Sequence, residues 1–305
     1  MSFIQTVCGP IEPDQLGFTL MHEHLLGRSL KLGSDPDLTL DSEANAAEDL
    51  RHFYTAGGRA LVEMSPQDYG RDPLAYRRLS EATGVHIICV TGFIKSASLD
   101  PFVEGRSAHE LADTFIRDLC EGIGETGIRA GLLKAGSSKN TITPNEEKVF
   151  HAVAIAHKET GALISTHTEA GTMALEQVAL LTKDGVSPER ILIGHMDRLM
   201  DWDYHLAVAN TGVTLGYDQF AKEKYYPDRL RVEFVKRMCD AGFGGQLALS
   251  MDLARRSYFV GYGGGPGFTF MPWRIVPWLR EQGVTREQIE TLFVKTPARL
   301  LALSA

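Results

Sequence analysis

The sequence predicts an α/β fold, a (β/α)8 TIM barrel in which residues 1–305 form a single domain. Three observations predict it: the length of 305 residues, eight short apolar segments spaced along the chain, and stretches with helical periodicity between them. Strands that alternate with helices form a parallel sheet with right-handed crossovers, and eight such units close most naturally into a barrel.

Each predicted strand is a short apolar run that is bounded by turn residues. In chain order, the predicted strands cover residues 17–25, 60–65, 86–92, 129–135, 162–168, 191–196, 213–217 and 246–251. An open doubly wound sheet is the alternative arrangement of these elements. That fold would normally place a Gly-rich phosphate-binding turn after the first strand, where this chain has His22 and His24.

Helix ends are predicted where capping residues occur. Residues 40–56 have helical periodicity, open at Asp41 or Ser42, and stop at a pair of glycines. Thr143 precedes a proline and a glutamate-rich first turn, which predicts the start of another helix. Residues 187–189 repeat this arrangement briefly before the sixth strand.

The composition excludes several classes of protein. Hydrophobic residues make up 44% and charged residues 23% of the chain, which is the balance of a globular protein. The net charge of −8 argues against nonspecific nucleic-acid binding, which needs a basic surface. No apolar run is long enough to span a membrane, and no signal peptide is apparent. Four scattered cysteines indicate a reducing compartment, so we expect a cytoplasmic enzyme.

Side chains that can bind metal lie at the ends of the predicted strands. His22 and His24 end the first strand, and residues two apart in a strand project to the same face. The candidate site also includes Lys134, His167, His195 and Asp252, each at the end of a later strand. In barrel enzymes the carboxyl ends of the strands form the catalytic face, so we expect these six side chains to converge. Four histidines and one aspartate exceed the ligands of one open catalytic zinc, which indicates two divalent ions.

Lys134 is an unusual residue to find beside two metal ions. Two dications would repel a protonated ammonium and lower its pKa steeply. A neutral amine can instead react with carbon dioxide, and the resulting carbamate has two oxygens that could bridge metals about 4 Å apart. The alternative is an ordinary strand-end lysine that points to solvent. The apolar residues on both sides of Lys134 favour the carboxylated form.

Three segments, residues 17–24, 129–134 and 191–195, resemble the phosphotriesterase family of the amidohydrolase superfamily, and the similarity covers essentially the whole chain. The resemblance implies ligands for two metal ions: His22, His24 and Asp252 for one, and His167 and His195 for the other. Carboxylated Lys134 and a hydroxide would bridge them, although some relatives use a glutamate as the bridge. Zinc is the expected metal, and the ligands also accept manganese, cobalt or iron.

The mechanism that this resemblance implies agrees with the proposed metal centre. One metal polarises the carbonyl or phosphoryl oxygen of the substrate, and the bridging hydroxide attacks. Asp252, the expected catalytic residue, accepts the proton of the hydroxide and passes it to the leaving oxygen as a general acid. A two-metal site needs no serine nucleophile, and the chain has no Gly-x-Ser-x-Gly elbow. The resemblance also implies a homodimer.

The loops after the strands contain the residues that are expected to contact the substrate. In the acyl-homoserine lactonase branch of the family, a tyrosine after the third strand and an arginine after the seventh line the pocket. This chain lacks that tyrosine and has Gln219 in place of the arginine. The predicted substrate-binding residues are Lys95, Lys224, Arg255 and Tyr258, which resemble those of a branch that hydrolyses phosphorylated sugar lactones. Converging Lys and Arg side chains suit a phosphate, although the same charges could be solvated or pair with Asp218 and Glu223.

We therefore expect a metal-dependent lactonase, acting on ester bonds, whose substrate is a phosphorylated or otherwise anionic sugar lactone. An organophosphate triesterase or an amide hydrolase with the same metal centre is the alternative, followed by a non-catalytic binding protein on this fold. Glu169 and Asp197 lie two residues beyond ligand histidines, so they either hydrogen-bond to them or are acids at helix N-termini. Residues 258–277 form a long Gly- and aromatic-rich loop, either a lid or a dimer contact.

Overall fold

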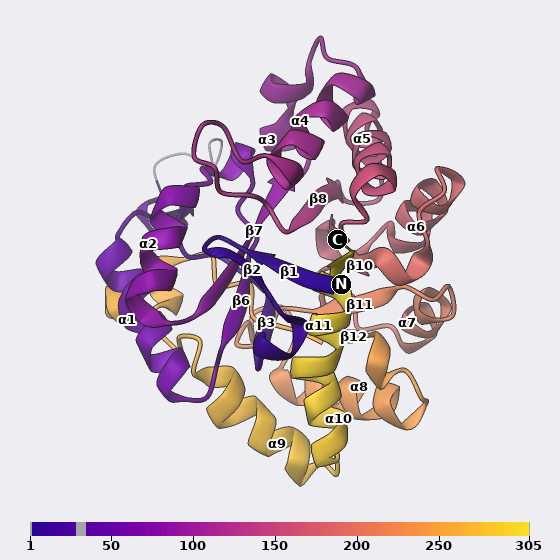
Figure 1. Cartoon of the computed structure of the whole chain (residues 1–305). Coiled ribbons are helices and arrows are strands. Elements are labelled where there is room, and N and C mark those ends of the chain that lie inside the picture. The colour runs from indigo at the N-terminus through magenta and orange to yellow at the C-terminus, as the bar shows by residue number, and fades with distance from the viewer. Residues whose placement is uncertain (1, 29–34, 305) are drawn as a thin grey trace.

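Eight parallel strands form a barrel with helices around it, which confirms the predicted fold class (Figure 1). The computed structural model describes residues 2–28 and 35–304. The barrel strands are β3 (Thr19–Glu23), β6 (Ala60–Glu63), β7 (His86–Gly92), β8 (Leu132–Ser137), β9 (Ile164–Thr168), β10 (Ile191–Ile193), β11 (Thr214–Tyr217) and β12 (Leu247–Leu249). Each strand pairs in parallel with the next barrel strand along the chain.

The barrel closes between its first and last strands. The amide of Asp252, just after β12, donates a hydrogen bond to the carbonyl of His22 on β3 at 3.0 Å. In the other direction, the amide of His22 donates to Ser250 Oγ at 2.9 Å. These two bonds bring the two ends of the sheet together at the mouth, which is the open end formed by the carboxyl ends of the strands.

All eight predicted strands are present, and the differences lie at their ends. β10 stops at Ile193, before the predicted limit of residue 196, because His195 adopts a left-handed backbone conformation with φ of 59°. β8 begins at Leu132 rather than at residue 129. β3 contains a bulge that the sequence pattern did not predict: Met21 and His22 together lie opposite Val62 of β6. A bulge of this kind adds one residue to one strand of a pair.

The helices cover the outside of the barrel (Figure 1). They are α1 (Glu43–Thr55), α2 (Pro73–Thr83), α3 (Ser96–Val103), α4 (Ala108–Cys120), α5 (Pro144–Thr160), α6 (Ala174–Lys183), α7 (Trp202–Ala209), α8 (Asp228–Asp240), α9 (Val276–Glu281), α10 (Arg286–Glu290) and α11 (Thr296–Leu301). Ser42 rather than Asp41 caps α1, since its side chain accepts from Asn45 N. Thr143 caps α5 as predicted. The turn at residues 187–189 leads into a single 3-10 turn, Pro188–Arg190.

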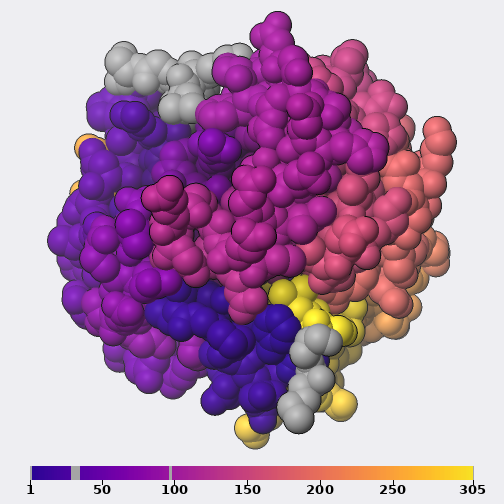
Figure 2. Space-filling model, turned by 45° about the horizontal axis from the view of Figure 1, so that its top comes forward, coloured from indigo at the N-terminus to yellow at the C-terminus, as the bar shows by residue number. Residues whose placement is uncertain are grey.

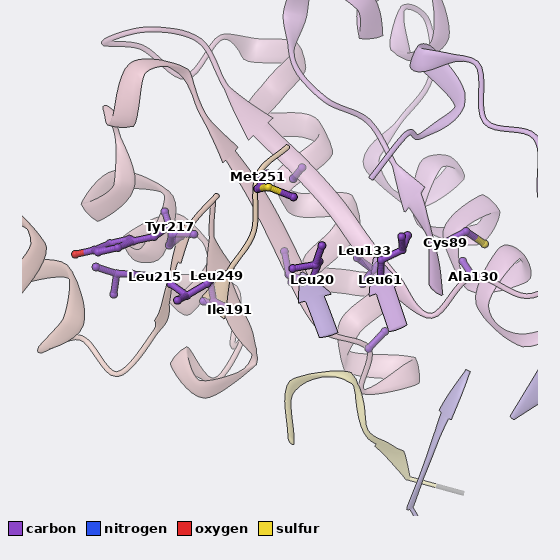
Figure 3. Packing of buried hydrophobic residues seen from close by; sticks show 14 of the residues in the cluster. Leu20, Leu61, Cys89, Ala130, Leu133, Ile191, Leu215, Tyr217, Leu249 and Met251 are labelled. Atoms are coloured by element: carbon purple, nitrogen blue, oxygen red, sulfur yellow. The ribbon is translucent and has the colours of Figure 1, made fainter. Parts of the chain in front are cut away.

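Successive residues of the strands face two separate apolar cores. Leu61 on β6 and Leu133 on β8 belong to a large outer core (Figure 3). Helix residues such as Leu50 share this core. The strand neighbours Val62 and Leu132 face the interior of the barrel. The interior core fills the lower part of the barrel, so polar side chains are left to occupy its mouth.

Segments from both ends of the chain seal the base of the barrel. Strands β1 (Ser2–Thr6) and β2 (Gly9–Ile11) form a hairpin, and β13 (Leu303–Ser304) pairs with β1. Figure 2 shows the indigo N-terminal segment beside yellow residues near the C-terminus. Ile4 and Leu301 extend from these segments into the interior core. Within residues 2–28 and 35–304, no helix combines the length and apolar character that a membrane crossing requires.

Residues 258–277 are anchored on α1, which disagrees with a mobile lid over the mouth. Two backbone amides of this segment donate to the buried Asp49 of α1, at 2.8 and 3.1 Å. Tyr262 Oη accepts from the amides of residues 41 and 42. Phe268 is fully buried, with its ring 6.1 Å from that of Phe53. The segment therefore packs against the buried side of α1 that carries Asp49 and Phe53.

Candidate metal centre

The six predicted side chains lie together in the mouth. His22 is on β3 and His24 follows it, while the other four come from four further strand ends: Lys134 on β8, His167 on β9, His195 after β10 and Asp252 after β12. His22, His24, Lys134 and His195 are buried, and His167 and Asp252 are partly exposed. The strand ends thus bring residues 230 positions apart into one site, as expected for the carboxyl face of a barrel.

One group of side chains has the arrangement of a cation site. His24 Nε2 lies 3.1 Å and His22 Nε2 lies 3.8 Å from the same oxygen, Asp252 Oδ1. The ligand atoms of these three residues are all within 4.8 Å of one another. Two imidazole nitrogens and a carboxylate oxygen are suitable donors for a divalent ion of the zinc type.

Lys134 lies next to this group, with its amine in the interior of the mouth. Its Nζ is 3.4 Å from His22 Nε2, and its side chain is 1% exposed. Burial lowers the pKa of Lys134 to about 8, although the nearby carboxylates of Asp252 and Asp218 act in the opposite direction. The prediction that Lys134 is not a solvent-facing lysine is therefore confirmed.

His167 and His195 form a second group. His195 Nε2 lies 2.9 Å from His167 Nδ1, and the two rings are nearly perpendicular. His195 also lies beside His22, with 4.8 Å between ring centroids, so the two groups adjoin each other. Burial is the main cause that lowers the pKa of both His22 and His167 to about 3, and His22 and His167 are therefore neutral near pH 7.

Three of the four imidazoles are oriented by a polar partner on Nδ1. His24 Nδ1 lies 2.7 Å from Ser65 Oγ, and His195 Nδ1 lies 2.6 Å from Asp218 Oδ1. Asp218 Oδ2 is also 3.3 Å from His22 Nδ1. The other nitrogen of these three rings is directed toward the interior of the mouth. A partner that fixes one nitrogen sets the tautomer and leaves the other nitrogen free to bind a metal.

Asp218 is a functional residue that the sequence analysis missed. It forms, with His22 and His195, another group whose ligand atoms lie close enough for a cation. We interpret it instead as the orienting carboxylate, because it also accepts from the amide of His195 at 3.0 Å. Burial alone would raise the pKa of Asp218, but the two histidines hold it well below its usual range. The only sequence signal for this role is its position directly after β11.

Lys222 and Gln219 hold Asp252, and neither was predicted to do so. Lys222 is 5% exposed, and its Nζ donates to Asp252 Oδ2 and to the Asp252 carbonyl, both at 2.6 Å. Gln219 Nε2 donates to Asp252 Oδ2 at 2.9 Å and to Asp218 Oδ1 at 3.0 Å. Burial would raise the pKa of Asp252, but the charge of Lys222 helps to hold it well below its usual range. Lys222 therefore pairs with Asp252 and not with Asp218.

Two of the six site residues have a strained backbone. His195 and Asp252 have φ values of 59° and 50°, in the left-handed region that residues other than glycine rarely adopt. Each follows its strand by two or three residues, at the point where the chain turns into a loop. Strain of this kind persists only where the surroundings hold it, and it is concentrated at functional sites.

Buried glutamates support the loops of the mouth. Glu23 Oε1 accepts from Ser250 Oγ and the Met251 amide, and its Oε2 accepts from the Leu253 amide. Glu63 accepts in the same way from the amides that follow β3. Glu23 therefore faces away from the metal groups, as expected for the residue between His22 and His24 in a strand. Asp197 accepts from the Asp218 and Gln219 amides rather than from a histidine.

The predicted substrate-binding cations have different surroundings. Lys95 forms an ion pair with Glu169, and Glu169 Oε2 lies 3.2 Å from His167 Nε2. Glu169 therefore contacts a candidate ligand, as one of its two interpretations predicted. Arg255 pairs with Asp37 at 3.2 Å and with Asp35 at 3.5 Å.

Lys224 and Tyr258 lie near each other at the mouth. Lys224 is exposed, and its Nζ is 5.8 Å from the centre of the Tyr258 ring. Lys222 Nζ is 5.9 Å from the same ring on the side of Asp252. These contacts place Tyr258 between an exposed cation and the candidate metal centre.

The fold and the site define a class of protein: a parallel barrel with histidine and aspartate groups at its mouth that could hold metal ions. The chain belongs to the phosphotriesterase family, since the model of that family matches residues 2–301. Among curated relatives, the phosphotriesterase homology protein of Escherichia coli is 34% identical over 94% of this chain and 98% of its own length. A phospho-furanose lactonase of Mycoplasmopsis synoviae is 31% identical over 98% of this chain and 92% of its own length.

Solved structures agree with this assignment. A lactonase from Listeria monocytogenes superposes with a TM-score of 0.95 and 36% identity, covering 99% of this chain and all of the other. The Escherichia coli homology protein, whose structure contains phosphate in its active site, gives a TM-score of 0.91 and covers 94% and 99% of the two chains.

Proposed function

We propose that this protein is a metal-dependent hydrolase that opens a lactone carrying a phosphate or another anionic group. The observation that carries the proposal is the convergence of four imidazoles, one carboxylate and a buried amine at the mouth of the barrel. Relatives that are named lactonases and cover nearly the whole chain support the choice of a lactone.

The side chains fit two divalent ions. His22, His24 and Asp252 would hold one ion, His167 and His195 the other, and carboxylated Lys134 would bridge them. The fit rests on the orientation of the rings, because Ser65 and Asp218 occupy the opposite nitrogens of three of the four. Zinc suits this donor set, and manganese, cobalt and iron are compatible with it. Bound there, such ions would polarise the carbonyl oxygen of the substrate and make a water reactive near neutral pH.

Asp252 would move the proton in this reaction. A water that attacks the lactone carbonyl must lose a proton, and the ring oxygen that leaves must gain one. Asp252 is held ionised by Lys222 and Gln219, which bind its Oδ2, while Oδ1 faces the histidines. Its carboxylate is therefore ready to accept the proton and to return it to the alkoxide that forms as the ring opens.

The anionic part of the substrate would bind at the cations of the mouth. Lys224 and Tyr258 lie together close to Asp252, and Arg255 and Lys95 are the other predicted contacts. An anion would be attracted to these side chains despite the net charge of −8, because the interaction depends on local charge.

An activity panel tests the proposal. Metal-loaded protein would be assayed with a sugar γ-lactone carrying an exocyclic phosphate, the same lactone without phosphate, paraoxon, and a simple anilide. We expect the phosphorylated lactone to have the largest kcat/KM. Paraoxon as the best substrate would favour a triesterase, which the 32% identity to an aryldialkylphosphatase of Saccharolobus solfataricus makes the second candidate. Turnover of none of the four would leave the non-catalytic binding protein.

We also propose a cytoplasmic homodimer. All four cysteines are free, which agrees with a reducing compartment. Trp273, in the segment of residues 258–277, is 63% exposed and is the most exposed large apolar side chain of the described residues. It supports the dimer-contact interpretation of that segment, and light scattering of the wild type and of Trp273→Ala would test it. A wild type that is monomeric at micromolar concentration would contradict the dimer.

A further inference from the structure

A cation–aromatic cluster lies on the loops that follow β10 and β11. The guanidinium carbon of Arg198 is 3.7 Å from the centre of the Tyr225 ring, and Lys224 Nζ is 4.9 Å from the same ring. Lys224 Nζ is also 5.8 Å from the ring of Tyr258. Arg198, Tyr225 and Lys224 therefore form a continuous surface with Tyr258, which was predicted from sequence to contact the substrate.

This cluster leads directly into the candidate metal centre. Lys222 Nζ lies 5.9 Å from the Tyr258 ring and 2.6 Å from Asp252 Oδ2. The Tyr225 amide donates to the Lys222 carbonyl at 3.0 Å, so the loop that carries the cluster is tied to the residue that holds Asp252. Cations and aromatic rings thus alternate from the outer end at Arg198 to the buried carboxylate.

Arg198 differs from the other arginines at the mouth in its partners. Arg255 is paired with Asp37 and Asp35, and Arg256 with Asp41. In the described part of the chain, neither Arg198 nor Lys224 forms an ion pair with a carboxylate. An anion that binds Arg255 must compete with two aspartates, whereas an anion that binds Arg198 displaces none.

The position of Arg198 also suits substrate contact. It ends the short helical turn η6 (Met196–Arg198), three residues after the candidate ligand His195. Its side chain is partly exposed and is stacked on an aromatic ring, which limits its rotation. A guanidinium held in this way keeps its planar set of N–H donors free for a bidentate contact with a phosphate or a carboxylate.

We propose that Arg198 determines specificity by binding, together with Lys224, the anionic group of the substrate. The proposal rests on the proposed function, and it adds a residue that the sequence analysis did not select. Arg198 and Lys224 would share the charge of a phosphate, while their common contact with the ring of Tyr225 holds the two cations near each other.

The chain offers a matched control for Arg198. Arg237 on α8 also stacks on an aromatic ring, with its guanidinium carbon 3.8 Å from the Trp202 ring centre, and it is exposed. Arg237 lies in the last turn of α8, at the opposite end of that helix from the loop that carries the cluster. Arg198→Ala and Arg237→Ala therefore remove the same charge and the same kind of contact from two different places.

The test compares the metal-loaded wild type with both variants on the phosphorylated and the unphosphorylated γ-lactone. We expect Arg198→Ala to lower the ratio of the two kcat/KM values about tenfold, mainly through KM, because one charge-assisted contact is lost. Arg237→Ala should keep the wild-type ratio. Arg198→Lys should recover part of the loss, since it restores the charge but not the planar donors. Thermal unfolding of each variant shows whether it is folded.

A binding measurement separates this proposal from the proposed function. Calorimetric titration with inorganic phosphate needs no turnover, and Arg198→Ala should weaken binding about tenfold while Arg237→Ala does not. If the wild type hydrolyses neither lactone, the proposed function fails but this titration still tests Arg198. Equal phosphate affinity and equal substrate ratios in the two variants would overturn the role of Arg198.

Discussion

The floor of the mouth and its rim hold their charged groups in different ways. On the floor, His22, His195 and Asp252 are each fixed by at least one buried partner. On the rim, Arg255 is held by partly exposed aspartates and Arg198 by an aromatic ring. The difference indicates that the floor is built for a fixed geometry, whereas the rim can change its partners when a substrate binds.

Substitutions in the two regions should have effects of different size. Exposed ion pairs contribute only about 0–1 kcal/mol, because water and salt screen them. Removal of one partner from a buried hydrogen-bonded pair leaves the other partner buried without a hydrogen bond, and the resulting loss of stability is several times larger. Substitutions on the floor should therefore abolish turnover or metal binding, and substitutions on the rim should change the choice of substrate.

The largest effect is expected at Asp252. Asp252→Asn keeps the size of the side chain but removes the charge that binds a metal and takes the proton, so kcat should fall by about a thousandfold. The lactone assay measures this, and circular dichroism checks the fold. Asp240→Asn, which changes an exposed aspartate paired with Lys236, is the control. A fall of less than tenfold would contradict the role of Asp252.

Lys134→Met tests the bridge between the two groups of the floor. Methionine has a similar volume and stays apolar, so the barrel should fold while the amine that would be carboxylated is lost. We expect elemental analysis to show two equivalents of divalent ion in the wild type and a clear deficit in Lys134→Met. The exposed Lys158→Met serves as the control. Full metal content in Lys134→Met, or an unmodified Lys134 amine in a crystal structure, would remove the bridge from the mechanism.

Asp218→Asn should have an intermediate effect, because Asp218 orients two imidazoles without facing the interior of the mouth. Loss of such an orienting partner typically costs about 10- to 100-fold in metal affinity. Competition with a chelator would measure the affinity. Asp197 is the control, because in this region it accepts hydrogen bonds only from two backbone amides and from Arg231. Unchanged metal affinity in Asp218→Asn together with a loss of metal affinity in Asp197→Asn would reverse the roles of the two aspartates.

The smallest effect is expected at Arg255. Because Arg255 is already paired with Asp37 and Asp35, Arg255→Ala should lower the preference for the phosphorylated lactone by only about threefold. Arg256→Ala, which loses a similar pair with Asp41, is the control. A loss for Arg255→Ala larger than that for Arg198→Ala would reverse the comparison within the rim.

The sequence predicted the fold well because each barrel strand is an apolar run between turn residues. It also placed the six side chains of the site, because parallel strands bring their carboxyl ends to one edge. It missed Asp218, Gln219 and Lys222 as partners of the site, since their contacts join loops that are neighbours in space and distant in the chain. It also missed the partners of Arg255, because nothing in the local pattern relates residue 255 to residues 35 and 37.

The bulge in β3 has a consequence for how the length of this strand can vary. Met21 and His22 both face inward because they share a single opposing residue. Deletion of Met21 would restore regular pairing, so that His22 alone would face inward opposite Val62 and the interior core would lose the side chain of Met21. A one-residue change of length in the first barrel strand would therefore alter the packing directly beneath the site, whereas a loop of the barrel could absorb the same change.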